Sequence, residues 1–390
     1  MSWPLVKLGD LFKVTSGGTP SRKKPEYYDG GDIHWVKTGD LHNKYVRTAS
    51  EFITQEGLDG SSARRYPKGT VLVAMYGATI GACSILDIEA ATNQACAAFT
   101  PTEKVDPVFL YYLLKHSKPA FVKAGSGGAQ PNISGTFLKN FEIPLPPIDE
   151  QKRIAAILDK ADAIRQKRKQ TIDLADEFLR SVFLDMFGDP VTNPKGWDVK
   201  RLEELISEGD KLNYGVVQPG DDDENGVPLV RSGDLYDSGT PLSKVRRVSS
   251  SVDEKHRKSR LKGNEILIAC VGSIGKVGWV DESMIGWNIA RAVTRIPLRD
   301  SVNREYIFRY LQSPVIQGYF QKETRAVAQP TLNVGLISKT PIALPPQEQQ
   351  DEFLKVHNKV NRFKQNAIVK SKHMDELFKS LSQKAFSGQL

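Results

Sequence analysis

The sequence contains few residues of the kinds that redox and metal chemistry use. Its 390 residues include three cysteines, Cys83, Cys96 and Cys270, and six scattered histidines. The cysteines show neither CxxC spacing nor the Cys/His spacing of a metal site, and each has apolar or small neighbours. We therefore expect reduced cysteines that pack in a cytoplasmic protein, and no metal site.

Long apolar runs are also missing. No stretch approaches the roughly 20 apolar residues that a membrane-spanning helix needs. The first ten residues, "MSWPLVKLGD", lack the apolar core of a signal peptide. These absences argue against a membrane protein and against export, and they favour a cytoplasmic location.

Catalytic motifs are absent as well. "GSIGKVG" at 272–278 resembles a phosphate-binding loop, but Cys270 stands where the first glycine should be and Val277 replaces the Mg²⁺-binding hydroxyl. The sequence has no nucleophile elbow, no HExxH and no Asn/Asp-Pro-Pro-aromatic tetrad of amino-methyltransferases. A nuclease carboxylate cluster has loose spacing and stays open as an alternative. We expect a chain that is not itself an enzyme.

The strongest positive feature is an internal repeat. Landmarks recur in the same order at a separation that drifts from 194 to 199 residues. They are Trp3 and Trp197, Leu8 and Leu202, Gly39–Leu41 and Gly233–Leu235, "KGTVLVAMYGATIG" at 68–81 and "KGNEILIACVGSIG" at 262–275, Asn93 and Asn288, Ala95 and Ala290, Ala129–Pro131 and Ala328–Pro330, and the two Leu-Pro-Pro triplets at 145–147 and 344–346. The chain is therefore a tandem duplication.

Each copy ends in a proline-free segment with a heptad pattern, which predicts two helices of about 38 residues that pair with each other. The predicted apolar seam has the same register in both copies. Its members are Ile154, Ile157, Ala161, Ile164, Phe178 and Val182 in the first copy, and Phe353, Val356, Val360, Phe363, Met374, Leu377 and Leu381 in the second. Arg168, Thr171 and Lys370 interrupt the seam, either as solvated side chains or as polar groups that fix the register.

The remaining segments alternate short β-branched or aromatic runs with Gly, Asp and Pro, together with a few amphipathic helices. We predict an α/β (α+β) fold in two copies related by a pseudo-twofold duplication and separated by an antiparallel coiled coil. The expected boundaries are a globular domain at 1–147, a helix at 148–187, a linker at 188–196, a second globular domain at 197–346 and a second helix at 347–390.

The net charge of +8 suggests a polyanionic partner, and basic residues gather at one equivalent place in both copies. Phosphates are contacted by Lys and Arg, and base edges by Arg, Lys, Asn and Gln. Solvated loops would have the same composition, and Gln130, Asn132 and Gln329 could equally be structural caps. The candidate DNA-binding residues are Arg22, Lys23, Lys24, Tyr27, Arg64, Arg65, Gln130, Asn132, Lys244, Arg246, Arg247, Lys255, Arg257, Lys258, Arg260 and Gln329. We expect the acidic segment 220–226 to face away from phosphates.

Several motifs together resemble the specificity subunit of a type I restriction-modification system. They are "WPLVKLGDLFKVTSGGTPS" at 3–21, "IPLPPIDEQKRIAAIL" at 143–158 with its repeat at 342–357, and "LFKSLSQKAFSGQL" at 377–390. The resemblance covers essentially the whole chain. Gln349 departs from the acidic residue of the helix-entry motif, where the first copy has Glu150, and this exchange alters only a small helix-terminus preference.

The resemblance implies that each globular part is a target-recognition domain that reads one half of a bipartite site on double-stranded DNA. It implies a coiled coil that sets the half-site spacing, two modification (methyltransferase) subunits and ATP-dependent restriction subunits as partners. S-adenosylmethionine, ATP and Mg²⁺ would then be bound by those partners, and no cofactor is expected on this chain. Two alternatives remain at this point: a nuclease or methyltransferase that acts on DNA by itself, and a DNA-free coiled-coil scaffold.

Overall fold

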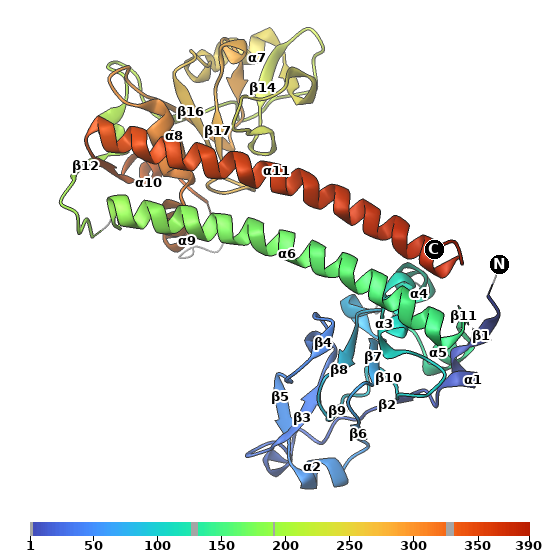
Figure 1. Ribbon diagram of the computed structural model, residues 1–390. Helices are drawn as coiled ribbons and strands as arrows, with labels where there is room; N and C mark the ends of the chain where they lie inside the picture. Colours follow the sequence, from blue (N-terminus) through green and yellow to red (C-terminus); the bar gives the residue numbers. More distant parts are fainter. Residues whose placement is uncertain (1–2, 126–131, 190–191, 325–330) are drawn as a thin grey trace. The chain divides into compact units, whose positions relative to one another are not determined.

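The computed structural model describes residues 3–125, 132–189, 192–324 and 331–390. The chain divides into two compact units (Figure 1). Unit 1 comprises Met1–Lys169 and Val369–Leu390, and unit 2 comprises Gln170–Ile368. Two 40-residue helices, α6 (Ile148–Phe187) and α11 (Gln347–Phe386), each run through both units. Each unit therefore contains one globular part, the beginning of one long helix and the end of the other.

Unit 1 is built on three sheets. The five-stranded sheet has the order β2 (Thr15–Ser16), β10 (Cys96–Phe99), β7 (Val71–Ala74), β8 (Cys83–Leu86) and β4 (Tyr45–Val46). The four-stranded sheet has the order β5 (Glu51–Ile53), β3 (Ile33–Val36), β9 (Ala90–Thr92) and β6 (Arg65–Tyr66), and β1 (Leu5–Lys7) pairs with β11 (Glu142–Pro144). The shorter helices are α1 (Leu8–Leu11), α2 (Gln55–Asp59), α3 (Pro107–His116), α4 (Lys118–Gly125) and α5 (Gly135–Asn140), with 3₁₀ turns at Pro25–Tyr27, Thr38–Asp40 and Gly77–Thr79.

Unit 2 repeats this plan. Its four-stranded sheet has the order β13 (Asn213–Tyr214), β19 (Val293–Pro297), β16 (Glu265–Ala269) and β17 (Val277–Trp279). A three-stranded sheet has the order β15 (Arg246–Val248), β14 (Val227–Val230) and β18 (Asn288–Ile289), and β12 (Asp198–Arg201) pairs with β20 (Pro341–Leu344). The shorter helices are α7 (Ser250–Lys255), α8 (Arg304–Gln312), α9 (Pro314–Thr324) and α10 (Val334–Ser338), with 3₁₀ turns at Leu202–Leu205, Ser232–Asp234, Leu242–Lys244, Arg257–Ser259 and Glu282–Met284.

Each Leu-Pro-Pro triplet is followed, four residues after its last proline, by a buried glutamine that has a structural role. Gln151 is buried at the start of α6, where its Nε2 donates to the Pro146 carbonyl at 2.9 Å and to the Lys104 carbonyl at 3.0 Å. Gln350 likewise donates to the Pro345 carbonyl at 2.8 Å at the start of α11. A buried carbonyl must be hydrogen-bonded, so the glutamine fixes the corner between strand and helix in both copies.

The two long helices are antiparallel within each unit. In unit 1, Arg165 of α6 forms an ion pair with Asp375 of α11 at 2.7 Å, and nearer the start of α6, Arg153 donates to the carbonyl of Leu390 at 3.0 Å. In unit 2, Asp176 pairs with Lys364, and further along α6 the Phe183 ring lies 6.0 Å from the Phe353 ring. The predicted antiparallel pairing of the helices is confirmed.

At four positions the predicted seam differs from the observed one by one residue. Ile164, Phe178, Phe363 and Leu377 are 39, 52, 58 and 48% exposed, so they do not lie between the helices. The contacting stripe follows one position later and includes Leu158, Asp162, Arg165, Leu179 and Phe183 on α6 and His357, Asn361, Lys364, Phe378 and Ser382 on α11. Both stripes have the same three-and-four spacing, and the helices meet through the ion pairs Arg165–Asp375 and Asp176–Lys364 as well as through the apolar contact of Phe183 with Phe353.

The other predicted seam residues are partly or fully buried. Ile154 and Phe353 lie in the cores of units 1 and 2, where the start of each helix packs on its globular part. The half-buried members are Ile157, Ala161, Val182, Val356, Val360, Met374 and Leu381. Burial at these positions comes partly from the domain cores, since Leu381 packs against the core of unit 1 and Val182 against that of unit 2.

Candidate nucleic-acid interface

Two basic loops of unit 1 meet although 40 residues separate them in the sequence. The carbonyl of Gly18 accepts a hydrogen bond from the buried Trp35 indole at 3.0 Å. A Cβ on Gly18 would lie 2.2 Å from the Ser62 hydroxyl and 2.5 Å from the Ala63 amide, so only glycine permits this approach. The packing brings the predicted loop at 22–24 and the one at 64–65 to one side of unit 1.

Several cations of these loops are engaged within the protein. The Arg22 guanidinium lies 4.4 Å from the centre of the Tyr28 ring and pairs with Glu51. A hydrogen bond from Lys37, followed by the one from Arg22, holds the pKa of Glu51 below its ordinary value. Arg65 pairs with Glu89 at 2.9 Å. These contacts position the side chains, and they reduce the charge that is free to meet a phosphate.

Lys24 donates to the hydroxyl of the buried Tyr27 at 2.9 Å, and this hydrogen bond raises the lysine pKa. Tyr27 therefore packs inward and does not offer its ring to a ligand. Lys23 and Arg64 are exposed, and neither has an ion-pair partner among the residues that the structure describes. They are the free cations of this side of unit 1.

In unit 2 the candidates lie in the basic segment, which we define as residues 244–260. Its first part is tied to the acidic loop 220–226. The backbone amide of Arg247 donates to the Asp222 carboxylate at 2.8 Å, and its Nη1 donates to the Gly226 carbonyl at 2.8 Å. Arg246 donates to the Gly220 carbonyl. The acidic loop therefore lies beside these arginines. Lys244 ends a 3₁₀ turn, and its side chain lies outside the described part of the chain.

The second part of the basic segment contains the accessible charge. Arg260 donates to Asp253 at 2.8 Å and to Glu254 at 2.6 Å, and these hydrogen bonds raise its pKa. Arg257 approaches Glu254 only at 3.5 Å. Lys255 and Lys258 are exposed and have no ion-pair partner among the described residues. With Arg257 they line a groove that Asn213 and Tyr214 also line.

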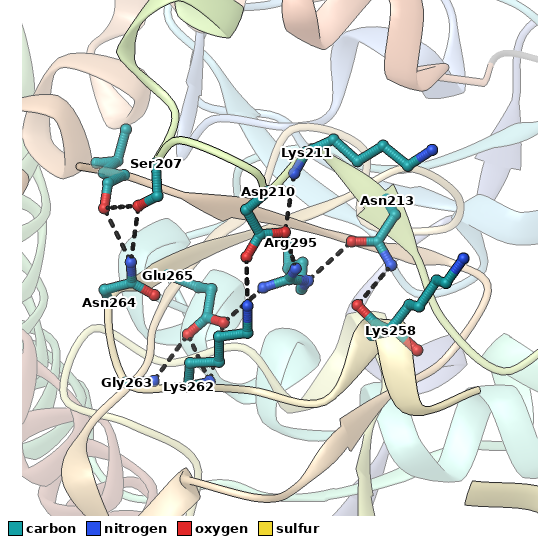
Figure 2. Close-up of polar contacts among 12 residues, drawn as sticks. Ser207, Asp210, Lys211, Asn213, Lys258, Lys262, Gly263, Asn264, Glu265 and Arg295 are labelled. Carbon is teal, nitrogen blue, oxygen red and sulfur yellow. Dashed lines mark hydrogen bonds and ion pairs between the residues drawn. The ribbon is translucent and has the colours of Figure 1, made fainter. Parts of the chain in front are cut away.

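A buried ionic network includes Asn213, one of the residues that line this groove (Figure 2). Arg295 is 2% exposed and donates to Glu265 at 2.8 Å, to Asn213 at 2.8 Å and to Asp210. Asn213 in turn donates to the carbonyl of Lys258 at 3.2 Å. A hydrogen bond from Lys262 helps to keep the pKa of Asp210 low, against the opposing effect of its burial. The network links the strand end at Asn213 to the basic segment.

Ile133 and Leu332, which follow the predicted glutamines in the sequence, lie at the same edge of the main sheet in both units. The main sheet is the five-stranded sheet in unit 1 and the four-stranded sheet that contains β19 in unit 2. Ile133 donates to the Met75 carbonyl at 2.9 Å, and Leu332 donates to the Cys270 carbonyl at 3.0 Å. Asn132 is exposed and forms a bridge with Tyr76. Gln130 and Gln329 lie outside the described residues. Sequence reasoning missed Tyr76 and Tyr214, two exposed tyrosines at this edge, although Tyr76 lies two residues after β7 and Tyr214 ends β13.

Within the described ranges, no group of three or more His, Cys, Asp or Glu side chains is placed to hold a metal ion. Cys83, Cys96 and Cys270 are buried free thiols, and burial raises the pKa of Cys83 and of Cys96 to about 12. No helix among the described residues is both long and apolar enough to cross a membrane.

Comparison with known proteins gives a consistent family. The family model described as "Type I restriction modification DNA specificity domain" matches residues 2–174 and 194–373. The EcoBI specificity subunit of Escherichia coli is 27% identical, with 99% of this chain and 80% of that protein covered. The MjaIX specificity subunit of Methanocaldococcus jannaschii is 27% identical, with 90% and 85% covered.

Solved structures support the fold. A chain from a structure of a type I restriction-modification system aligns with a TM-score of 0.63 at 19% identity, covering 100% of this chain and 98% of the other. The S subunit from M. genitalium aligns with a TM-score of 0.55 at 16% identity, covering 98% and 96%. At these identities the alignments establish the architecture alone.

Proposed function

Because this chain belongs to the type I restriction modification DNA specificity family, we propose that it is the non-catalytic specificity subunit whose two units each read one half of a bipartite DNA site. The observation that carries the proposal is the duplication itself: the same fold occurs twice, with a different set of exposed cations at the same side. Units that share a fold but differ in surface side chains suit two half-sites of different sequence. The subunit would act in the cytoplasm.

The exposed apolar residues of the long helices support a docking role. Unit 1 carries Ile164 and Leu377, and unit 2 carries Phe363 and Phe178. These pairs are equivalent under the 199-residue repeat, because Ile164 corresponds to Phe363 and Phe178 to Leu377. Exposed large apolar side chains on a helix face are typical of protein interaction sites. Two equivalent pairs fit two copies of one partner, which we propose to be the modification subunit.

The docking proposal is tested by stoichiometry. Native mass spectrometry of the co-expressed proteins should give two modification subunits for each specificity chain. Ile164→Ser with Leu377→Ser should leave one, bound at unit 2, whereas the control change Lys169→Ser on an exposed polar position should leave two. Retention of both subunits by the double variant would refute this docking surface.

The partners would supply the chemistry. S-adenosylmethionine would be bound by the modification subunits, and ATP and Mg²⁺ by restriction subunits, so that this chain contributes recognition only. Methylome sequencing of cells that carry the chain with its modification subunit tests the whole proposal. The expected result is a bipartite methylated motif that disappears when the chain is deleted. Methylation or cleavage by the purified chain alone would contradict it.

The helices are proposed to set the distance between half-sites. The positions Gln170 and Lys370 lie near the middle of α6 and α11. Inserting seven residues after each position keeps both heptad registers and adds about 10 Å to the rod. At about 3.4 Å per base pair this lengthens the spacer by about three base pairs while both half-sites stay unchanged. New half-sites at the original spacing would rule out this role.

A further inference from the structure

The main sheets of the two units have an equivalent edge, but the side chains along that edge differ. In unit 1, Ser16 and Ala74 lie opposite Ala97 and Cys96 of β10, and the chain continues from Ala74 to the exposed Tyr76. In unit 2, Tyr214 and Ala269 lie opposite Thr294 and Val293 of β19. The equivalent positions thus hold Ser16 or Tyr214 on one strand, and Tyr76 or Val271 on another.

Each unit presents one exposed tyrosine there. Tyr76 is 44% exposed and Tyr214 is 55% exposed. Tyr76 is fixed by the bridge between its backbone and Asn132. An exposed aromatic side chain on a fixed backbone offers a large contact area at a low cost in conformational entropy. The two units therefore present the same kind of group from different strands.

Tyr214 also lies beside exposed lysine and arginine side chains. It borders the groove that Asn213 and residues 254–259 complete. Lys255 and Lys258 have no ion-pair partner in the described ranges, and Arg257 is only loosely paired. This combination of an aromatic side chain and several cations complements a nucleic acid, whose bases offer apolar and acceptor groups beside phosphates.

The buried network makes this setting rigid. Arg295 holds the Asn213 side chain on one side, and Asn213 holds the carbonyl of Lys258 on the other (Figure 2). Arg295 is itself held by Glu265, which is fully buried. The strand end that carries Tyr214 and the turn that carries Lys258 are thereby fixed to each other. A site with supported geometry loses less entropy when it binds.

We propose that Tyr214 contacts a base edge in the half-site read by unit 2, with Lys255 and Lys258 on the adjacent phosphates, and that Tyr76 has the same role in unit 1. The assignment rests on the proposed function and goes beyond it by naming one specificity-determining side chain in each unit. Because the tyrosines come from different strands, they would read different positions within their half-sites.

The experiment measures DNA binding by the complex of this chain with its modification subunits. Binding to the methylome-derived site is compared with binding to a duplex of scrambled sequence, over a range of salt concentrations. Tyr214→Ala should weaken binding to the specific site by about 5- to 150-fold, the range expected for one base contact, and leave the scrambled duplex within about twofold. Lys255→Ala with Lys258→Ala should weaken binding to both duplexes and flatten the salt dependence by about two units of slope.

Matched variants complete the design. Tyr76→Ala should relax specificity only in the half-site read by unit 1. Tyr236 is a partly exposed tyrosine outside the groove, and Tyr236→Ala should leave the specificity for both half-sites unchanged. Tyr214→Phe separates the ring from the hydroxyl: retained specificity assigns the contact to the ring, and lost specificity assigns it to the hydroxyl. If the wild-type complex discriminates between the duplexes and Tyr214→Ala discriminates equally well, the inference is wrong. If the wild-type complex shows no preference, the proposed function itself fails.

Discussion

The two units build the same sheet around different interiors. In unit 1, Ala98 of the central strand β10 lies opposite Thr15 of β2. In unit 2, the equivalent pair on β19 and β13 is Arg295 and Asn213. Glu265 of β16 accepts a hydrogen bond from Arg295. Small side chains fill one sheet and a buried ionic network fills the other. The comparison indicates that the fold does not require the charges, and that they serve the surface they support.

The largest effect should come from breaking this network. Arg295→Ala leaves Glu265 buried without its ion-pair partner, which typically costs about 3–5 kcal/mol of unfolding free energy. The unit 1 residues at the three positions are Ala98, Thr15 and Thr70, the last of which precedes β7 as Glu265 precedes Ile266. Importing them, as Arg295→Ala with Asn213→Thr and Glu265→Thr, should recover a large part of the loss, because no buried glutamate without an ion-pair partner remains. Calorimetry that separates the unfolding of the two units provides the measurement. A triple variant less stable than the single one would contradict the comparison.

The ends of the long helices offer a matched pair of aromatic residues. Phe187 at the end of α6 is fully buried between Tyr306 and Phe353. Its counterpart Phe386 at the end of α11 is half-buried and lies 5.7 Å from Phe109. Phe187→Ala should destabilise unit 2 by about 3 kcal/mol, and Phe386→Ala should destabilise unit 1 by less. Equal losses, measured by urea unfolding, would show that both ends are equally packed.

A third difference involves acid stability. His357 of unit 2 occupies the position that the buried Leu158 occupies in unit 1. Burial, reinforced by the charge of Arg309, lowers the pKa of His357 to about 4, although Asp237 and Glu305 partly oppose the shift. The folded state therefore keeps a neutral imidazole where the unfolded chain binds a proton below its ordinary pKa of 6.5.

The stability of unit 2 should therefore fall as the pH is lowered. The contribution of His357 is fully present above pH 6.5 and is lost as the pH falls toward 4, by about 2 kcal/mol between pH 7 and pH 5. Replacing the histidine by the unit 1 residue, His357→Leu, should remove this pH dependence from unit 2. Thermal unfolding at several pH values tests it. An unchanged pH profile in the variant would show that other groups cause the acid sensitivity.

The sequence predicts the repeated parts of this molecule better than the parts in which the copies differ. The duplication, the helices and the proline corners follow from local patterns that occur twice. The residue-by-residue alignment of one copy with the other is harder to predict. The pairing of Val36 with Thr92 and of Val230 with Ile289 makes Asn93 equivalent to Ala290, and not to Asn288 as the sequence match suggests. An insertion between matching landmarks can be placed only when the strands are paired.

The interface illustrates a second limit. Composition identifies the cations, but their availability depends on acids and carbonyls that are distant in sequence. Arg246 and Arg247 are held by the acidic loop, and Arg260 by Asp253 and Glu254, whereas Lys255 and Lys258 are free of ion pairs within the described ranges. The DNA-binding residues as a set remain predictions, and the structure ranks them by the charge that each can offer.

The smallest expected effect tests the register of the helix pair. Phe363 of unit 2 belongs to the seam that hydrophobicity predicts, yet more than half of its side chain is exposed, whereas Phe183 on the contacting stripe is fully buried. Phe363→Ser should therefore change the unfolding free energy of the isolated chain by no more than about 0.5 kcal/mol, as exposed substitutions usually do. Phe183→Ser should cost at least about 3 kcal/mol, because it leaves a cavity among Phe187, Tyr310 and Phe353. The helices in unit 2 would have to meet through the predicted apolar stripe if urea unfolding gave the two variants similar losses. The exposed residues Ile164, Phe178, Phe363 and Leu377 are available to bind a partner only if Phe363→Ser leaves the isolated chain stable. The small effect on stability is therefore what the proposed docking role requires.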